Sequence, residues 1–199
     1  MLNTVFVKEY PLPSVDREEW CRYAACKQTD GGIETLFEES LGLLPDKQVG
    51  RVCFRAFTAE ECLSSVGEYA KSKLVQLRFQ GAQYAIAFAA TVGLGFDRLV
   101  ARYASVSPTR GALLQALGAE RIESLCELFQ KEIKTACKKE GYVANERFSA
   151  GYGDFALQAQ TWFFKELDCP RKIGVTLTDG YLMSPTKSVT GLIVCKYRA

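Results

Sequence analysis

The sequence predicts an α+β fold, in which a mainly antiparallel, twisted sheet is flanked by helices, one of them a long central helical segment. Apolar residues make up 48% of the 199 positions, which is enough for a packed core. Alternating or β-branched stretches recur from the beginning of the chain to its end, and the longest helical pattern lies between them. No internal repeat or linker divides the chain, so residues 1–199 are expected to form a single domain.

The first quarter of the chain should hold a strand and two helices. Residues 4–10 form a short apolar strand pattern that ends at Pro11, which cannot donate to a ladder. Residues 14–26 begin with Ser14 and carry acids in the first turn, which predicts a helix capped by that serine. Residues 32–43 carry apolar side chains at helical spacing and are followed by a proline, which predicts a second helix.

The next part of the chain combines strands with two further helices. Thr58 and Glu61 have the spacing of a capping box, which predicts a helix over residues 58–73. After the glycines that follow the last of these strands, residues 96–106 are expected to be helical. Strands are expected at three places: residues 49–58, 73–79 and 82–91.

The longest helical pattern covers about residues 110 to 140, where leucine, isoleucine and phenylalanine form an apolar stripe. Ser107 or Thr109 is the expected cap, and Gly141 is placed to end the helix. Gly118 leaves two possibilities open, one continuous helix or two shorter ones.

The last quarter begins with a loop and ends with two strands. Residues 145–155, NERFSAGYGDF, contain too many glycines for a helix and too many residues for a tight hairpin. A helix is expected over residues 156–168. Residues 173–178 alternate and residues 188–195 are β-branched and apolar, which predicts two strands joined by a longer loop.

Charge and hydropathy exclude several classes of protein. The 25 basic and 23 acidic residues give a net charge of +2, and no dense Lys/Arg cluster suggests nucleic-acid binding. No run of 18 or more uncharged apolar residues occurs, so no membrane-spanning helix is expected. The N-terminus lacks the basic start and apolar stretch of a signal peptide, and a cytoplasmic protein is therefore expected.

Histidine is absent and cysteine is frequent. The absence of histidine excludes Ser-His and Cys-His nucleophiles and imidazole metal ligands. The eight cysteines include no CxxC pair, and the closest two, Cys21 and Cys26, have no second close pair to complete a metal site. Reduced thiols in the core are therefore favoured over a redox or metal protein.

Arg147, the loop from Ser149 to Gly153 and the stretch from Ser188 to Gly191 form the most informative group of residues. An arginine fork binds carboxylates, and small residues let the backbone approach a ligand. Tyr152 offers a flat face to a ring or an edge to a sulfonium. Together these residues would suit a small zwitterion that carries an aromatic base. On composition alone, a strand end with a surface arginine and a glycine turn remains the favoured alternative.

The stretches RFSAGYGD and IGVTLTDGYLMSPTKSVTGLIV resemble the activation (reactivation) domain of cobalamin-dependent methionine synthase. The resemblance is clearest over residues 145–195, and the long helix of that domain corresponds to part of residues 85–145. It implies the methionine synthase activation domain fold and the binding of S-adenosylmethionine.

The resemblance also implies site residues. Arg147 matches the arginine of the family that contacts the ligand, and Ile193 stands about where the family has a further tyrosine. An acid on the long helix is implied as well, with Glu120 and Glu123 as candidates. The expected ligand-binding residues are therefore Arg147, Ser149, Ala150, Gly151, Tyr152 and Ile193.

The implied function is to support the reductive methylation that reactivates a cobalamin protein. The cofactor of this chain would be S-adenosylmethionine, with cobalamin held by a partner corrinoid-binding protein or domain. A flavodoxin-like or other reductant would supply the electron, so the chain would not be self-sufficient as an enzyme. The alternative is a non-catalytic interaction protein that kept the fold and docks on a corrinoid-binding partner.

Overall fold

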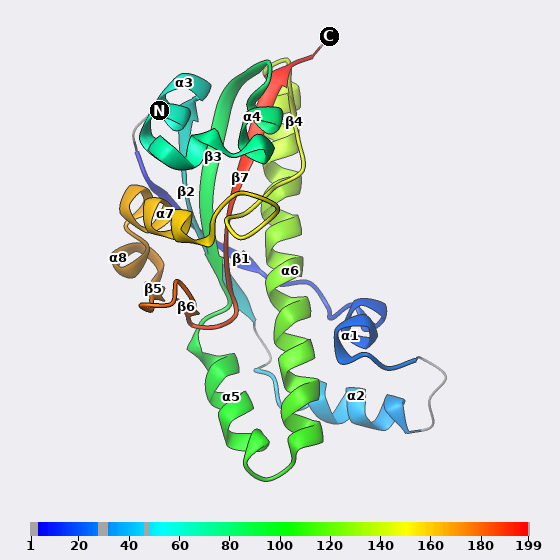
Figure 1. Cartoon of the computed structure of the whole chain (residues 1–199). Helices are drawn as coiled ribbons and strands as arrows, with labels where there is room; N and C mark the ends of the chain where they lie inside the picture. Colours follow the sequence, from blue (N-terminus) through cyan, green and yellow to red (C-terminus); the bar gives the residue numbers. More distant parts are fainter. Residues whose placement is uncertain (1–3, 28–31, 46–47, 199) are drawn as a thin grey trace.

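The computed structural model describes residues 4–27, 32–45 and 48–198, and its centre is a five-stranded sheet (Figure 1). All neighbouring strands of this sheet are antiparallel. A separate hairpin pairs β5 (Thr176–Leu177) with β6 (Met183–Ser184). In spatial order the strands of the main sheet are β1 (Phe6–Pro11), β2 (Val49–Thr58), β3 (Ala82–Thr91), β7 (Ser188–Tyr197) and β4 (Tyr142–Ala144).

Helices cover this sheet and extend beyond it. Two short 3-10 segments, Gly67–Lys71 and Leu157–Ala159, join or precede α-helices. The α-helices are α1 (Arg17–Ala24), α2 (Ile33–Leu41), α3 (Ala59–Val66), α4 (Lys73–Phe79), α5 (Leu94–Ala104), α6 (Pro108–Lys139), α7 (Gln160–Leu167) and α8 (Cys169–Ile173). The predicted α+β fold with a mainly antiparallel sheet, flanking helices and a long helix is confirmed.

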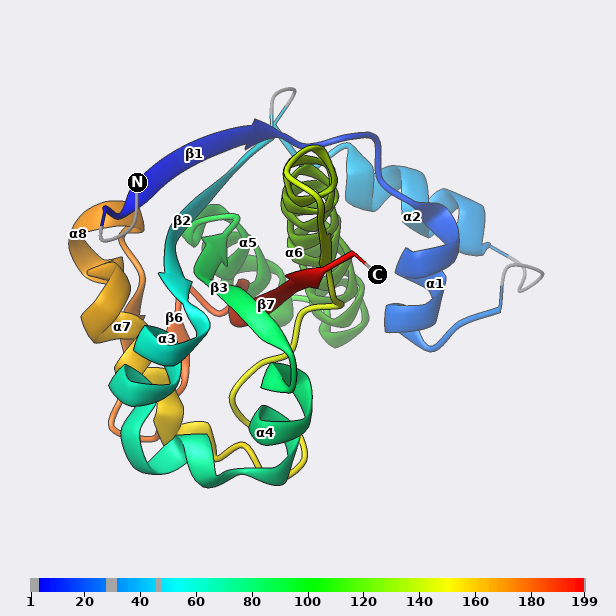
Figure 2. The ribbon, with the colours of Figure 1, turned by 90° about the horizontal axis from the view of Figure 1, so that it is seen from above.

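The sheet has a core on each face, because side chains alternate along its strands. Viewed from above, it curls between α6 on one side and α3, α7 and α8 on the other (Figure 2). Cys53 and Leu192 belong to the core beneath α3, α7 and α8, whereas their neighbours Val52 and Ile193 pack toward α6. The two sides are thus built from adjacent residues of the same strands.

Helix α6 runs without interruption for 32 residues, so Gly118 does not divide it. The side chain of Ser107 caps its first turn, and Gly141 follows its end with φ of +80°. A Cβ atom on Gly118 would lie 2.7 Å from Cε of Lys187, in the turn before β7. The lysine side chain packs against the helix at this glycine, so a larger residue at position 118 would have to displace it.

The part of α6 nearest its N-terminus leaves the sheet and packs with α1, α2 and α5 instead (Figure 1). Trp20 and Phe37 lie in the middle of this third core, with ring centroids 4.9 Å apart. Phe96 of α5 and Leu117 of α6 belong to the same core.

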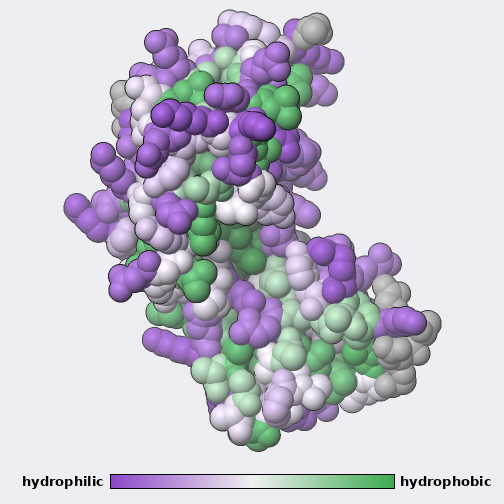
Figure 3. Space-filling view, viewed as in Figure 1, coloured by the Kyte–Doolittle hydropathy of each residue, from purple (hydrophilic) through white to green (hydrophobic). Residues whose placement is uncertain are grey.

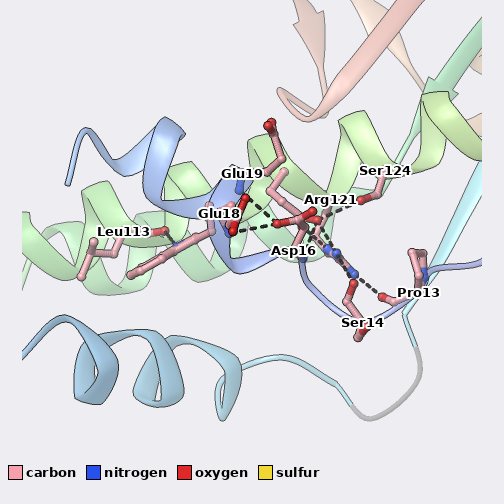
Figure 4. A network of polar contacts seen from close by, with 10 residues as sticks. Pro13, Ser14, Asp16, Glu18, Glu19, Leu113, Arg121 and Ser124 are labelled. Atoms are coloured by element: carbon pink, nitrogen blue, oxygen red, sulfur yellow. Dashed lines mark hydrogen bonds and ion pairs between the residues drawn. The ribbon is translucent and has the colours of Figure 1, made fainter. Parts of the chain in front are cut away.

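A buried ion pair fastens the N-terminal segment to α6 (Figure 4). The side chains of Glu120 and Arg121 are 1% and 0% exposed, and they contact each other through two hydrogen bonds. Arg121 also donates to the carbonyls of Pro13 and Ser14, while Glu120 accepts from the backbone N–H of Asp16 at 3.1 Å. Every charged group of this pair therefore has partners, as a buried pair requires.

The first helix begins later than expected. Asp16, rather than Ser14, is its N-cap, and its Oδ1 accepts from the backbone N–H groups of Glu18 and Glu19 at 2.9 and 3.2 Å. The carbonyl of Ser14 accepts from Arg121 instead. A carboxylate at the cap is the stronger acceptor, since it also complements the positive end of the helix dipole.

The strand expected over residues 73–79 is wrong, because this segment is helix α4. Its side chains suit either period, but Val75 and Phe79 are both buried and stand four positions apart on one helical face. The side chain of Ser72 caps the helix by accepting from the backbone N–H of Val75. The cap, rather than the apolar pattern, decides the structure here.

Two other expected elements are shorter than predicted. Gly67 ends α3, so the helix predicted over residues 58–73 becomes an α-helix followed by a 3-10 segment. Ile173 belongs to α8, and Gly174 with φ of +73° leaves only Thr176–Leu177 as a strand. This strand pairs with β6 rather than joining β7 in the main sheet.

Candidate functional site

A cavity of about 510 Å³ lies beside the beginning of β7, where the chain from Arg147 to Tyr152 turns away from the sheet. Its walls come from this loop and from α4, α6, α7, β6 and β7. The loop is the yellow segment that crosses in front of β7 in Figure 1. On the same face, apolar and neutral residues gather along the middle and hydrophilic side chains surround them (Figure 3). The volume is within the range of small-molecule sites.

The loop is held by its own backbone hydrogen bonds. Phe148 pairs with Leu192 of β7, with N–O distances of 3.0 and 2.8 Å, and this bridge fixes where the loop leaves the sheet. Gly151 has φ of +91°, a conformation that costs glycine little. Its N–H donates to the carbonyl of Phe155 at 2.7 Å, and the N–H of Phe155 donates to the carbonyl of Tyr152. The result is a compact turn that presents Tyr152.

Asp154 joins this loop to α4. Its carboxylate accepts from the hydroxyl of Ser72 at 2.7 Å and from the backbone N–H groups of Lys73 and Leu74 at 2.6 and 3.0 Å. These three hydrogen bonds lower the pKa of Asp154 from 3.8 to about 2. The loop and the N-terminus of α4 therefore form one wall of the cavity.

Arg147 and Glu123 form an ion pair at the side of the cavity that α6 provides. The side chains remain 20% and 34% exposed, so both charges are within reach of a ligand. Gln130, one further residue of α6, accepts from the backbone N–H of Arg147 at 3.0 Å and donates to Glu146. Gln130 thereby fixes the backbone from which the arginine projects.

Polar side chains line the inner wall. The hydroxyl of Ser149 donates to the carbonyl of Thr190 at 2.6 Å, and the hydroxyl of Thr190 donates to Oε1 of Gln160 at 2.7 Å. Both Thr190 and Gln160 are buried, and both line the cavity. With Oε1 of Gln160 accepting this hydrogen bond, the NH₂ group is the donor end of the same side chain.

Two larger side chains, one from the loop and one from α4, also line the cavity. The ring of Tyr152 is 71% exposed, which is unusual for tyrosine and leaves a free aromatic face. Arg78 of α4 also lines the cavity, with its guanidinium 5.8 Å from the ring centroid of Phe148. The cavity thus combines two arginines, one carboxylate, an exposed ring and uncharged hydrogen-bonding groups.

Five of the six residues expected at the site line this one cavity: Arg147, Ser149, Ala150, Gly151 and Tyr152. Ile193 is fully buried on the α6 face, in the core that contains Phe88 and Phe129, and it does not line the cavity. Of the two candidate acids on the long helix, Glu123 lines the cavity. Glu120 is buried in the pair with Arg121.

Sequence reasoning missed Arg78, Gln130 and Gln160. Arg78 was hidden by the expectation of a strand, although the serine before that segment is a helix-capping signal. The two glutamines carry no local motif, since only the packing of α6 and α7 against the loop brings them to the site.

Residues 61–199 match the family model described as "Vitamin B12 dependent methionine synthase, activation domain". The chain belongs to this family. The matched range includes every residue that lines the cavity, whereas α1 and α2 lie before it. A comparison with curated protein sequences finds no match.

Solved structures show the same fold. One similar structure is titled "Crystal Structure of the MetH Reactivation Domain bound to AdoHcy". The similarity covers 98% of this chain and 79% of that one, with a TM-score of 0.62 and 16% sequence identity. At this identity the likeness establishes the methionine synthase activation domain fold, including the N-terminal part that the family model leaves unmatched.

The described residues form neither a membrane-spanning helix nor a metal-binding cluster. None of their helices is both long and apolar enough to cross a membrane. Within residues 4–27, 32–45 and 48–198, no three acidic or cysteine side chains are grouped so as to hold a metal ion. All eight cysteines are free thiols.

Proposed function

We propose that this chain binds S-adenosylmethionine in the cavity beside β7 and supports the reductive methylation of a cobalamin protein. The single observation that carries the proposal is the Arg147–Glu123 pair, which lines the same cavity as an exposed tyrosine ring and a glycine turn. Membership in the methionine synthase activation domain family supports the same ligand.

The ion pair suits the amino-acid end of the ligand. A zwitterion carries a carboxylate and an ammonium group two bonds apart, so it is recognised best by a cation and an anion that lie side by side. Arg147 would donate to the carboxylate, and Glu123 would accept from the ammonium. Because the pair is partly exposed and formed without ligand, little reorganisation is needed when the zwitterion enters.

The remaining walls suit the nucleoside end. The exposed face of Tyr152 can stack on an aromatic base, and Arg78 can stack on it from α4. The NH₂ group of Gln160 offers a hydrogen bond to an oxygen or ring nitrogen. Gly151 keeps the loop backbone close to the cavity without a side chain in the way.

The ligand, when bound, supplies a methyl group on a sulfonium. The residues of this chain would bind and orient that ligand, and the openness of the site on the Tyr152 side would leave the methyl group accessible to a second protein. The cobalamin would be held by a partner corrinoid-binding protein or domain, and a flavodoxin-like or other reductant would supply the electron. Positioning is therefore the whole contribution proposed for this chain.

Calorimetric titration of the purified chain with S-adenosylmethionine tests the proposal. Arg147→Ala should weaken binding by about 1.5–3 kcal/mol, because a hydrogen bond to a charged group is lost. That loss corresponds to about a tenfold to a hundredfold change in Kd. Arg110→Ala is the matched control, since Arg110 also pairs with a glutamate but lies outside the cavity. Equal affinity of the two variants would remove Arg147 from the site.

One observation favours the second candidate, a non-catalytic protein that docks on a corrinoid-binding partner. Ile193 is buried on the far side of β7 and supplies no aromatic contact to the cavity. A well-folded chain that binds neither S-adenosylmethionine nor S-adenosylhomocysteine at millimolar concentration would support docking alone. Retention of the chain by an immobilised corrinoid-binding protein would then be the next measurement.

A further inference from the structure

Cys137 and Cys195 are far apart in the sequence but their sulfur atoms are 3.0 Å apart. Cys137 lies in the last turn of α6 and is half-buried, whereas Cys195 is a buried residue of β7. Two thiols in contact, one of them accessible, are the arrangement from which thiol–disulfide exchange proceeds. We propose that Cys137 and Cys195 are a site of reversible oxidation, at which a small-molecule disulfide of the glutathione type converts the two thiols into a disulfide bond.

Four of the other thiols lack this combination of contact and accessibility. Cys53 and Cys169 also interact with each other, but both are completely buried, so a dissolved disulfide cannot reach either sulfur. Cys62 and Cys126 are buried as well, and burial raises the pKa of each thiol to about 12. A high pKa disfavours the thiolate, which is the reactive form.

The environment of Cys137 favours the reactive form there. The hydrogen-bonding contact between the two sulfur atoms lowers the pKa of Cys137 and raises that of Cys195. The accessible sulfur is thereby the better nucleophile, and the buried sulfur keeps its proton until the second step.

The thiol–disulfide exchange proceeds in two steps. The Cys137 thiolate attacks one sulfur of the small disulfide, which forms a mixed disulfide and releases one small thiolate that takes up a proton. Cys195 then loses its proton and attacks the sulfur of Cys137, which closes the protein disulfide and releases the second small thiol. Two protein thiols are oxidised, and one small disulfide is reduced to two thiols.

The bond would join α6 to β7, the two elements that place Glu123 and Thr190 in the cavity. The stretch of chain that it closes contains β4, the loop from Arg147 to Asp154 and α7. The inference rests on the two thiols alone and does not depend on which ligand the cavity binds.

Peptide mapping of the full chain tests this inference. The reduced protein is incubated with oxidised glutathione, free thiols are alkylated, and the protein is digested without reducing agent. The expected product is a linked Cys137–Cys195 peptide pair, lighter by two hydrogens than the separate peptides and restored to thiols by dithiothreitol. Cys195→Ser should instead accumulate glutathione on Cys137, because no second thiol displaces it, and Cys53→Ser should leave the linkage unchanged.

Two results on the folded wild-type protein would overturn the proposal. One is a stable glutathione adduct on Cys137 with no linked peptide, since the neighbouring thiol would then not react. The other is the absence of any product at Cys137 while circular dichroism shows the native spectrum. Because both are read from the unsubstituted chain, neither depends on whether a cysteine variant folds.

Discussion

Two glutamates of α6, Glu120 and Glu123, stand three positions apart and form ion pairs with arginines in opposite surroundings. The pair of Glu120 with Arg121 is buried, and its remaining hydrogen-bonding groups are taken up by the N-terminal segment and by the hydroxyl of Ser124. The pair of Glu123 with Arg147 is partly exposed and lines a cavity. The same chemistry on one helix therefore holds the fold in one place and offers a binding site in the other.

A structural charge differs from a charge available to a ligand in how completely protein groups satisfy it. A buried pair is stable only when protein groups satisfy all of its donors and acceptors, which leaves nothing for a ligand. A partly exposed pair contributes little to folding, because water screens it, but it keeps capacity for new partners. Substitutions at the two glutamates should therefore affect different measurements.

The largest expected effect is that of Glu120→Ala on stability. The substitution leaves the guanidinium of Arg121 buried without its counter-ion, which should lower the free energy of unfolding by about 3–5 kcal/mol. Urea unfolding followed by circular dichroism measures the change. The double variant Glu120→Leu/Arg121→Met, in which both charges are removed, should regain part of the loss. A single variant as stable as wild type would show that the buried pair does not hold the N-terminal segment.

Glu123→Gln should leave the stability of the fold almost unchanged and weaken ligand binding. The free energy of unfolding should change by less than about 1 kcal/mol, as for other partly exposed ion pairs. The affinity for S-adenosylmethionine should fall by about 1.5–3 kcal/mol, because the acceptor for the ammonium loses its charge. Calorimetry and urea unfolding on the same sample separate the two effects. Unchanged binding together with reduced stability would make Glu123 a structural residue like Glu120.

Only the arginine of the pair between Glu123 and Arg147 could be predicted from the sequence. Arg147 stands in RFSAGYGD, a local stretch with its own resemblance, and it was expected at the site. Its acid partner lies on a helix that is distant in the sequence, and both glutamates fitted equally well. Which one faces the cavity depends on how α6 packs against β7 and the N-terminal segment, and that is a tertiary property.

The helices and strands, too, could be predicted from the sequence only in part. Strands β2, β3 and β7, the capping box at Thr58 and the long helix follow from local patterns and were predicted. Helix α4 was not, since seven residues with alternating apolar side chains satisfy either period. Its N-terminus is completed by Asp154, some 80 positions later in the chain, which no local pattern reveals.

Asp154 is an exposed acid, yet its hydrogen-bond partners belong to the fold rather than to a ligand. Its three hydrogen bonds lower its pKa in the folded state from 3.8 to about 2. A carboxyl group with a depressed pKa stabilises the fold fully above its ordinary pKa, and this contribution is lost as pH falls through the folded value. The attachment of the loop to α4 should therefore hold above about pH 4 and weaken between about pH 4 and pH 2.

Asp154→Asn tests this expectation and should have the smallest effect of the three. Because the amide keeps an acceptor for Ser72 and the backbone but does not titrate, stability should fall less steeply between pH 4 and pH 2 than in wild type. Urea unfolding at a series of pH values measures the two slopes.

Glu61 and Glu146 also have a lowered pKa, but wild type and Asp154→Asn both contain them, so their contributions cancel in the difference. Asp179→Asn, at an exposed acid in the turn after β5, makes the same change of charge and serves as the control. Equal slopes for Asp154→Asn and wild type would mean that the carboxylate does not hold the loop on α4.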